Sequence, residues 1–427
     1  MTIPGHRVLL LATLLVAGPL MAQQPPDDRI KQLESRIDDL ARQMSEIRQQ
    51  IDQLKGQPAQ PAPADAEDLT KIEVAPTAPA APAQPAQPSL TDVQTVNNVP
   101  NPGASKVFNP DTSVIGNFLG KAGKANPFEF GPNDIRQPLR LDESEVSFQA
   151  FVDPYAKAAF FLSVNQDGIE VEEGYAQFVT LPHGLTAKVG KFKAAFGKDN
   201  TWHAHVRPWV DQPLVIHNLF GDEGFSDHGI SVSKTIDNPW NTFIEATGEV
   251  TNGNVDNLFQ RGNLNDLVYD GHLKVFRDLS ENNNLEVGAS VARGTLNDTH
   301  NQFGGIDLTY RWKPLERGLY NSFVARLEAI TNRRGDADER LNGFYASADY
   351  QLGRRWFTGV RIDSSDRFAD GAIPHDRGLS ATLTFWPSEF SQVRGQLRRI
   401  RYGDAAAVNE LLFQLQFSIG AHGAHVF

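Results

Sequence analysis

The sequence contains no cysteine and no apolar run of the length that a membrane-spanning helix needs. Without cysteine there are no disulfide frameworks, thiolate metal sites or cysteine nucleophiles among the 427 residues. A spanning helix requires roughly 18 to 20 predominantly apolar residues, and the mean hydropathy of the chain is -0.38. These absences exclude a polytopic helical membrane protein and a disulfide-bonded small domain.

Basic residues are also fewer than acidic ones. The chain has 40 Lys and Arg against 52 Asp and Glu, which gives a net charge of -12. Proteins that bind nucleic acids usually present a basic face, so we expect no nucleic-acid partner. The abundant residues are Phe, with 26 against 8 Tyr, and Gly, with 35. Together they favour a chain rich in strands and turns.

The first residues have the composition of an export signal. Arg7 is followed by an apolar stretch from Val8 to Leu20, and small Ala22 stands at the expected cleavage position. This three-part pattern is typical of a secretory signal peptide. A membrane anchor helix is a weaker interpretation because Gly18-Pro19 interrupts the short apolar stretch. We assign residues 1–22 to the signal peptide.

The next two segments resemble a coiled coil and a tether. In residues 23–55 the apolar positions alternate in steps of three and four, at Ile30, Leu33, Ile37, Leu40, Met44, Ile47, Ile51 and Leu54. This heptad pattern predicts a short oligomerising coiled coil in the periplasm, although an amphipathic helix packed on the protein's own body would show a similar stripe. Residues 56–106 are rich in Pro and Ala and predict an extended, semi-rigid linker.

From residue 107 the apolar period changes to two, which predicts strands with one polar face. In 306–313, for example, Ile306, Leu308 and Tyr310 alternate with polar side chains. Segments of this kind are expected at 112–120, 140–152, 156–166, 170–181, 185–196, 228–237, 241–251, 267–278, 284–294, 304–313, 320–331, 341–352, 354–364, 378–387, 390–402 and 409–427. They number about sixteen, which fits outer-membrane barrels.

The connections between these segments also favour a barrel. Short connections such as 153–155 alternate with mostly longer ones such as 197–227 and 295–303, as expected for periplasmic turns and extracellular loops. Aromatic residues lie close to the short turns, as in a headgroup-level girdle. We therefore predict that residues 107–427 form an all-β, 16-stranded antiparallel transmembrane β-barrel in the bacterial outer membrane, with the N-terminal segment in the periplasm.

The end of the sequence has the form of an assembly signal. Counting back in twos from Phe427 reaches a series of apolar residues, among them Ile419, Phe417 and Leu415. A terminal Phe in register with the apolar face resembles the signal by which bacterial outer-membrane barrels are recognised. The resemblance implies the barrel assembly machinery as a partner, together with outer-membrane lipid.

One strand motif resembles a known family. The sequence Val189-Gly190-Lys191-Phe192-Lys193-Ala194-Ala195-Phe196-Gly197 is similar to the strand motif of the phosphate-selective porins. Across roughly 110–427, this resemblance implies a trimeric channel for ions and small hydrophilic solutes whose third loop folds inward. The third long connection here is 197–227, which is also the longest in the body, so the topology agrees with the resemblance.

Residues in 197–227 would then line a pore constriction, where charge and width set selectivity. The candidates are His203, His205, Arg207, Asp211, His217, Asp222 and Glu223. The histidines with Asp211 could also coordinate a divalent metal. Histidines at this spacing on a loop are more often exposed or hydrogen-bonded, so we assign no metal and no cofactor.

Basic residues with the parity expected for the lumen could favour anions. They are Lys188, Lys191, Lys193, Arg311, Arg326, Arg361, Arg394 and Arg398. Acidic residues such as Glu145, Glu328 and Glu410 share the same face, so the charge is nearly balanced. We predict a general porin, with a mild anion or phosphate preference as a hypothesis.

Three other functions were weighed. An outer-membrane enzyme would need a nucleophile with a base, and the serines show no pairing with His in the sequence and no Gly-x-Ser-x-Gly pattern. We therefore predict that the protein is not an enzyme. A substrate-specific or metal-related channel, and a barrel tethered to the cell envelope through 23–106, remain alternatives.

Overall fold

The computed structural model describes residues 110–123, 139–165, 168–369 and 372–420. The predicted signal peptide, coiled coil and linker (1–22, 23–55 and 56–106) and the terminal Phe427 lie outside these residues. They stay predictions.

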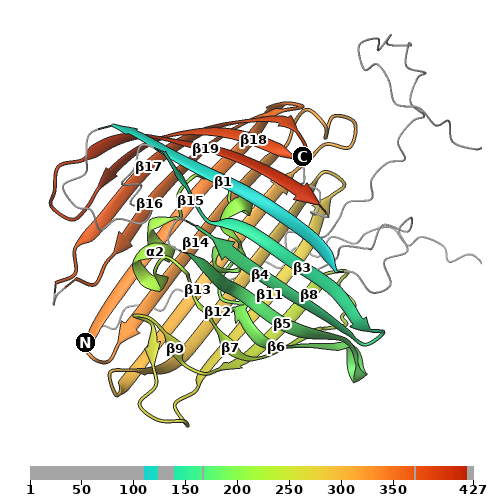
Figure 1. Cartoon of the computed structure of the whole chain (residues 1–427), viewed down its shortest axis with the longest axis vertical. Coiled ribbons are helices and arrows are strands. Elements are labelled where there is room, and N and C mark those ends of the chain that lie inside the picture. Colours follow the sequence, from blue (N-terminus) through green and yellow to red (C-terminus); the bar gives the residue numbers. More distant parts are fainter. Residues whose placement is uncertain (1–109, 124–138, 166–167, 370–371, 421–427) are drawn as a thin grey trace, which may run out of the picture. The chain divides into compact units, whose positions relative to one another are not determined.

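The described residues form one large antiparallel sheet (Figure 1). Its strands are β1 (Asp111–Gly123), β2 (Leu139–Leu141), β3 (Ser144–Asp153), β4 (Ala156–Val164), β5 (Ile169–Leu181), β6 (Leu185–Lys193), β7 (Ser226–Thr235), β8 (Phe243–Thr251), β11 (Val268–Ser280), β12 (Asn283–Leu296), β13 (Thr299–Trp312), β14 (Phe323–Arg334), β15 (Glu339–Gly353), β16 (Trp356–Asp366), β17 (His375–Ser388), β18 (Ser391–Arg401) and β19 (Val408–Gly420). A separate two-stranded hairpin consists of β9 (Asn254–Val255) and β10 (Phe259–Gln260).

The large sheet closes on itself. Strand β1 pairs antiparallel with β19, from Ser113 opposite Gly420 to Gly123 opposite Glu410, and it also pairs with β2 and β3. Since β2 and β3 are two pieces of one crossing, the 17 strands of the sheet make 16 crossings. The predicted 16-stranded antiparallel barrel is confirmed.

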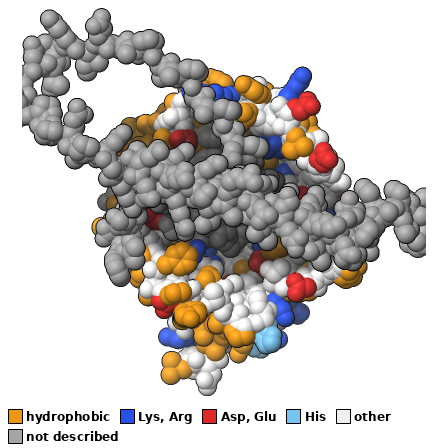
Figure 2. All heavy atoms as spheres, turned by 90° about the vertical axis from the view of Figure 1, so that its right-hand side faces the viewer, with side chains coloured by type: hydrophobic (Ala, Val, Ile, Leu, Met, Phe, Trp, Pro, Cys, Tyr) orange, Lys and Arg blue, Asp and Glu red, His pale blue; other side chains and the backbone are white. Residues whose placement is uncertain are grey.

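The wall of the barrel is apolar outside and polar inside. On β19, Leu411, Phe413 and Leu415 are 47%, 42% and 40% exposed, whereas Gln414 and Gln416 are buried. The face shown in Figure 2 carries hydrophobic patches on its outer margins. A water-soluble sheet protein would place the apolar side chains inside, so the inverted pattern is that of a barrel in lipid.

Two connections differ from the sequence-based expectation. The predicted long loop 295–303 is a two-residue turn at Asn297 and Asp298, both with positive φ. The predicted loop 332–340 shrinks to 335–338. The expected strict alternation of short and long connections was wrong. The adjacent Asn and Asp are residues that favour the left-handed turns of tight hairpins.

The helical elements are short. They are three 3₁₀ turns (Pro182–Gly184, Asp199–Thr201 and Ala204–Val206) and the helix α2 (Leu214–Phe220). Among the described residues, no helix is long and apolar enough to cross a membrane. Two of the 3₁₀ turns and α2 belong to the connection between β6 and β7.

Candidate functional site: the inner loop

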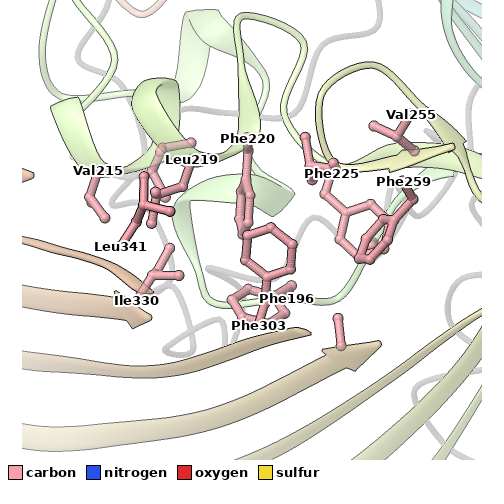
Figure 3. Packing of buried hydrophobic residues seen from close by; sticks show 14 of the residues in the cluster. Phe196, Val215, Leu219, Phe220, Phe225, Val255, Phe259, Phe303, Ile330 and Leu341 are labelled. Carbon is pink, nitrogen blue, oxygen red and sulfur yellow. The ribbon is translucent and has the colours of Figure 1, made fainter. Parts of the chain in front are cut away.

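Residues 194–225 connect β6 to β7 and lie against the inner wall of the barrel. We call this segment the inner loop. Helix α2 contacts β14, β15, β16 and β17. In Figure 3, Val215 and Leu219 of this helix lie near Leu341 and Ile330 of the wall, and Phe220 lies above Phe196 and Phe303. The loop is thus held inside by an apolar core, which is unusual on the polar face of a barrel.

A second connection joins the same core. The segment 252–267, which contains β9 and β10, contributes Val255, Leu258 and Phe259, all buried. Asn301 of β13 donates a hydrogen bond from Nδ2 to the Leu258 carbonyl at 2.7 Å. The sequence-based prediction of the constriction missed this segment. Its apolar residues among Asn, Gly and Asp were the available signal.

The inner loop enters the barrel at Gly197. The φ of this residue is +63°, and a Cβ here would lie 1.9 Å from Glu328 Oε1. Glu328 accepts the backbone N–H groups of Lys198 at 3.3 Å and Asp199 at 3.1 Å. Only glycine allows this close approach with that backbone conformation. Lys198 also pairs with Glu286 on β12 at 2.8 Å.

A buried ion cluster attaches the middle of the inner loop. Asp211 lies 2.9 Å from Arg361 Nη2 and 2.8 Å from Arg398 Nη1, and Gln396 donates to it. Burial opposes the charge of Asp211, but the guanidinium groups of Arg361 and Arg398 hold its pKa below the usual value. All three charged residues are buried. We call this set the arginine cluster.

Two other predicted lumen arginines, Arg394 and Arg326, also have partners in the inner loop. Arg394 donates from Nη1 to the carbonyls of Arg207 and Trp209, at 2.8 and 3.1 Å. Arg326 lies over the ring of Trp202, 5.6 Å from its centroid, and pairs with a carboxylate of β15. Both arginines contact groups of the inner loop. Their bonds go to the loop and its neighbours, which was not predicted.

An acidic cluster attaches the beginning of the inner loop to β3 and β5. His203 Nδ1 lies 2.9 Å from Glu145 Oε2 and 3.1 Å from Glu172 Oε2, and Nε2 bonds to Glu173 at 2.8 Å. His205 Nδ1 lies 3.4 Å from Glu145. Burial favours the neutral ring, but the carboxylates of Glu172 and Glu145 raise the pKa of His203 well above its usual value. We call these residues the histidine cluster.

The remaining predicted loop residues lie apart from both clusters. His217 Nδ1 is 2.8 Å from Asp222, whose side chain is largely exposed. Arg207 pairs with Asp199 at 3.1 Å. Burial raises the pKa of Glu223. The metal set considered from sequence, in which His203 and His205 join Asp211 and His217, is therefore not assembled.

The predicted basic residues at the start of the loop and on β13 have separate surroundings. Lys188 lies over the Tyr175 ring at 5.0 Å. Lys191 donates to the Val171 carbonyl at 2.7 Å, and Lys193 pairs with Glu172 at 2.7 Å. Arg311 lies 3.6 Å from a carboxylate oxygen of Glu286 on β12. The described structure shows no concentrated cationic ladder in these contacts.

One Ser–His–Asp arrangement was not visible in the sequence. Ser364 Oγ is 2.8 Å from His375 Nε2, and His375 Nδ1 is 2.7 Å from Asp366. Ester or amide hydrolysis would also need convergent donors for an oxyanion. Here the backbone of β16 and β17 is paired with a neighbouring strand on each side. We assign these contacts to the joining of the two strands.

Comparisons with known proteins agree with the fold. No family model matches the chain. A protein of Aquifex aeolicus (strain VF5), described as uncharacterized, is 29% identical over 393 residues, which cover 77% of this chain and 82% of that protein.

Solved structures similar to this chain include outer-membrane proteins. A loop-deletion mutant of OmpT, an outer membrane protein of Vibrio cholerae, has a TM-score of 0.50 and 9% identity, and the match covers 73% of this chain and 99% of that one. Salmonella typhi OmpF in complex with daunomycin also has a TM-score of 0.50 and 9% identity, over 73% and 98% of the two chains. The anion-selective porin from Comamonas acidovorans has a TM-score of 0.48 and 10% identity, over 73% and 97%. The likenesses at a TM-score of 0.50 show a shared barrel fold.

Proposed function

We propose that this protein is an outer-membrane porin through which small hydrophilic solutes diffuse passively, and that the inner loop narrows the passage. The observation that supports this most strongly is the polarity of the wall, with apolar side chains outside and polar ones inside. Such a wall places the barrel in a membrane and its interior in water. The likeness to porin structures supports the same fold. We do not propose an enzymatic activity.

Single-channel recording tests the proposal. The full chain, refolded in detergent and added to a planar bilayer, should give discrete conductance steps, and liposomes that contain it should swell in small sugars. A heat-denatured sample prepared in the same way is the control. Folded protein that inserts into the bilayer without any conductance would overturn the proposal.

The charge of the interior argues for a general channel. Arg326, Arg361 and Arg398 each pair with carboxylates, whereas Arg394 has carbonyl and neutral side-chain partners. The mild anion preference therefore depends on few unbalanced cations and stays a hypothesis. Reversal potentials in a salt gradient test it, and a clear cation preference would contradict it.

The trimer is proposed from the resemblance to phosphate-selective porins. We expect the refolded protein to migrate as a trimer on electrophoresis without heating and as a monomer after boiling. Sedimentation in detergent should give the same assembly. A monodisperse monomer that still conducts would separate the channel proposal from the trimer.

A further inference from the structure

We propose that Glu145, Glu172 and His203 bind a divalent transition-metal ion, with Zn²⁺ as the best match. The proposal goes beyond transport and concerns the histidine cluster alone. One ligand atom from each of these three side chains lies within 4.8 Å of the others. The three residues come from β3, β5 and the inner loop, so a bound ion would join the loop to the wall.

The distances suit a small ion. His203 Nδ1 is 2.9 Å from Glu145 Oε2 and 3.1 Å from Glu172 Oε2. Zinc binds nitrogen and oxygen ligands at about 2.0–2.2 Å in tetrahedral geometry, for which the ligands are about 3.3 Å apart. The two distances from His203 Nδ1 to the carboxylate oxygens are within a few tenths of an ångström of this value. The set of one imidazole and two carboxylates is one that zinc accepts, and a fourth position is left for water.

The orientation of His203 is that of a metal ligand. Its Nε2 bonds to Glu173 Oε1 at 2.8 Å, and a carboxylate on one ring nitrogen leaves the lone pair of the other for a metal. His203 Nδ1 and Glu145 Oε2 have no hydrogen-bond partner in the described structure although both are buried. They are close, but their contact lacks the direction of a hydrogen bond. Buried polar atoms without partners are costly, and a shared ion would satisfy them.

The charge of the cluster also favours a cation. Three carboxylates surround the ring, from Glu145, Glu172 and Glu173. Lys193 pairs with Glu172 Oε1 at 2.7 Å, and His205 Nδ1 lies 3.4 Å from Glu145 Oε2. The three carboxylates outnumber the charges of Lys193 and a protonated His203. A divalent ion that displaces the proton from His203 brings the cluster closer to neutrality.

Calorimetry on the refolded full chain tests the site. After dialysis against EDTA, titration with ZnCl₂ in detergent should show one zinc ion per chain, and metal analysis of the dialysed complex should agree. Glu145→Gln, Glu172→Gln and His203→Gln should each lose this binding. Glu173→Gln should weaken it about 10- to 100-fold, because the residue orients the ring without binding the ion.

The control is His217→Gln, which removes another loop histidine that is paired with a carboxylate. It should bind zinc as the unchanged chain does. Heat-modifiable migration on electrophoresis identifies the variants that fold, and only these are compared. Absence of saturable zinc binding by the unchanged, folded chain would overturn the proposal and leave His203 as a protonated partner of the carboxylates. Preference for Ca²⁺ over Zn²⁺ would overturn the assignment of the metal class.

Discussion

The inner loop is attached by two ion clusters that differ in composition. In the arginine cluster, Arg361 and Arg398 of β16 and β18 surround Asp211 and have further carboxylate partners on the wall. In the histidine cluster, one ring lies among several carboxylates of β3 and β5. The side-chain polar atoms of Asp211, Arg361 and Arg398 have hydrogen-bond partners, whereas the histidine cluster contains buried atoms without a hydrogen bond.

The difference indicates that the arginine cluster attaches the inner loop to the wall, whereas the histidine cluster can bind a cation. A buried cluster whose charged groups have opposite charges and hydrogen-bond partners can hold a loop but offers little to a ligand, and loss of one member leaves buried donors without acceptors. A cluster with surplus negative charge and unpartnered ligand atoms is incomplete without a cation. The beginning and the middle of the inner loop therefore have different chemical roles on the same barrel wall.

Loss of Asp211 should have the largest effect on the stability of the protein. In Asp211→Ala one donor group each of Arg361, Arg398 and Gln396 stays buried without its acceptor, so we expect a loss of about 3–5 kcal/mol in stability and noisier channel currents. Thermal or urea unfolding in detergent measures the first effect. Asp222→Ala is the matched control, because its pair with His217 lies near the surface and such pairs contribute little. Equal stability of the two variants would contradict the role of the arginine cluster.

Zinc should act on the histidine cluster alone. At a free concentration of about 100 times Kd, a bound ion stabilises the folded chain by about 2.7 kcal/mol. We expect the zinc-dependent rise in Tm to disappear in Glu172→Gln and to persist in Asp211→Ala. If Asp211→Ala also lost the rise, the two clusters would act as one unit.

The inner loop is attached a third time at Gly197, and substitution of this glycine should reduce stability by less than loss of Asp211 does. In Gly197→Ala the new methyl group meets Glu328 Oε1 and the positive φ is strained, so we expect a loss of about 1–3 kcal/mol. Gly221→Ala is the control, since φ is +82° but nothing lies within 4 Å of its Cβ position. Unfolding midpoints compare the two. Equal losses would assign the whole effect to backbone strain.

Of these changes, a fall in pH should have the smallest effect on the stabilisation that the arginine cluster provides. Because the pKa of Asp211 is lower in the folded chain than its usual value of about 3.9, its stabilisation is fully present above about pH 4. It is lost as the pH falls through the folded pKa. The charged and titratable groups around Asp211 are Arg361, Arg398, Asp363, Glu410 and Tyr402. We expect the current noise to rise as the pH is lowered below about 4. In Asp211→Asn much of this pH dependence of the noise should disappear.

The sequence predicted the barrel well because alternation is a local property. Ile306 and Leu308 point outward and are 56% and 37% exposed, while Asp307 and Thr309, which alternate with them, are buried, as the period of two predicts. Parity also assigned Arg361, Arg394 and Arg398 to the interior, and the structure has all three buried. The turn at Asn297 and Asp298 was missed because the length of a connection depends on where the strands end, which the apolar pattern leaves open.

The candidate site was predicted only in outline. The position and length of the 197–227 connection, together with the family resemblance, pointed to an inward fold. The partners of its residues could not be predicted, since Asp211 and Arg398 are separated by 187 residues and no local pattern links them. For the same reason His203 was considered with Asp211 and His217 in its own loop, whereas its partners lie on two distant strands.

The sequence by itself thus determined the wall of this protein, because each strand's two faces are specified by its own alternating residues. Only the tertiary structure decided how the interior is occupied. Closure of β1 on β19 brings β3, β5, β16 and β18 around the inner loop, and the charges that meet there come from segments far apart in the chain. Which carboxylates are paired with arginine and which are left for a cation follows from that closure.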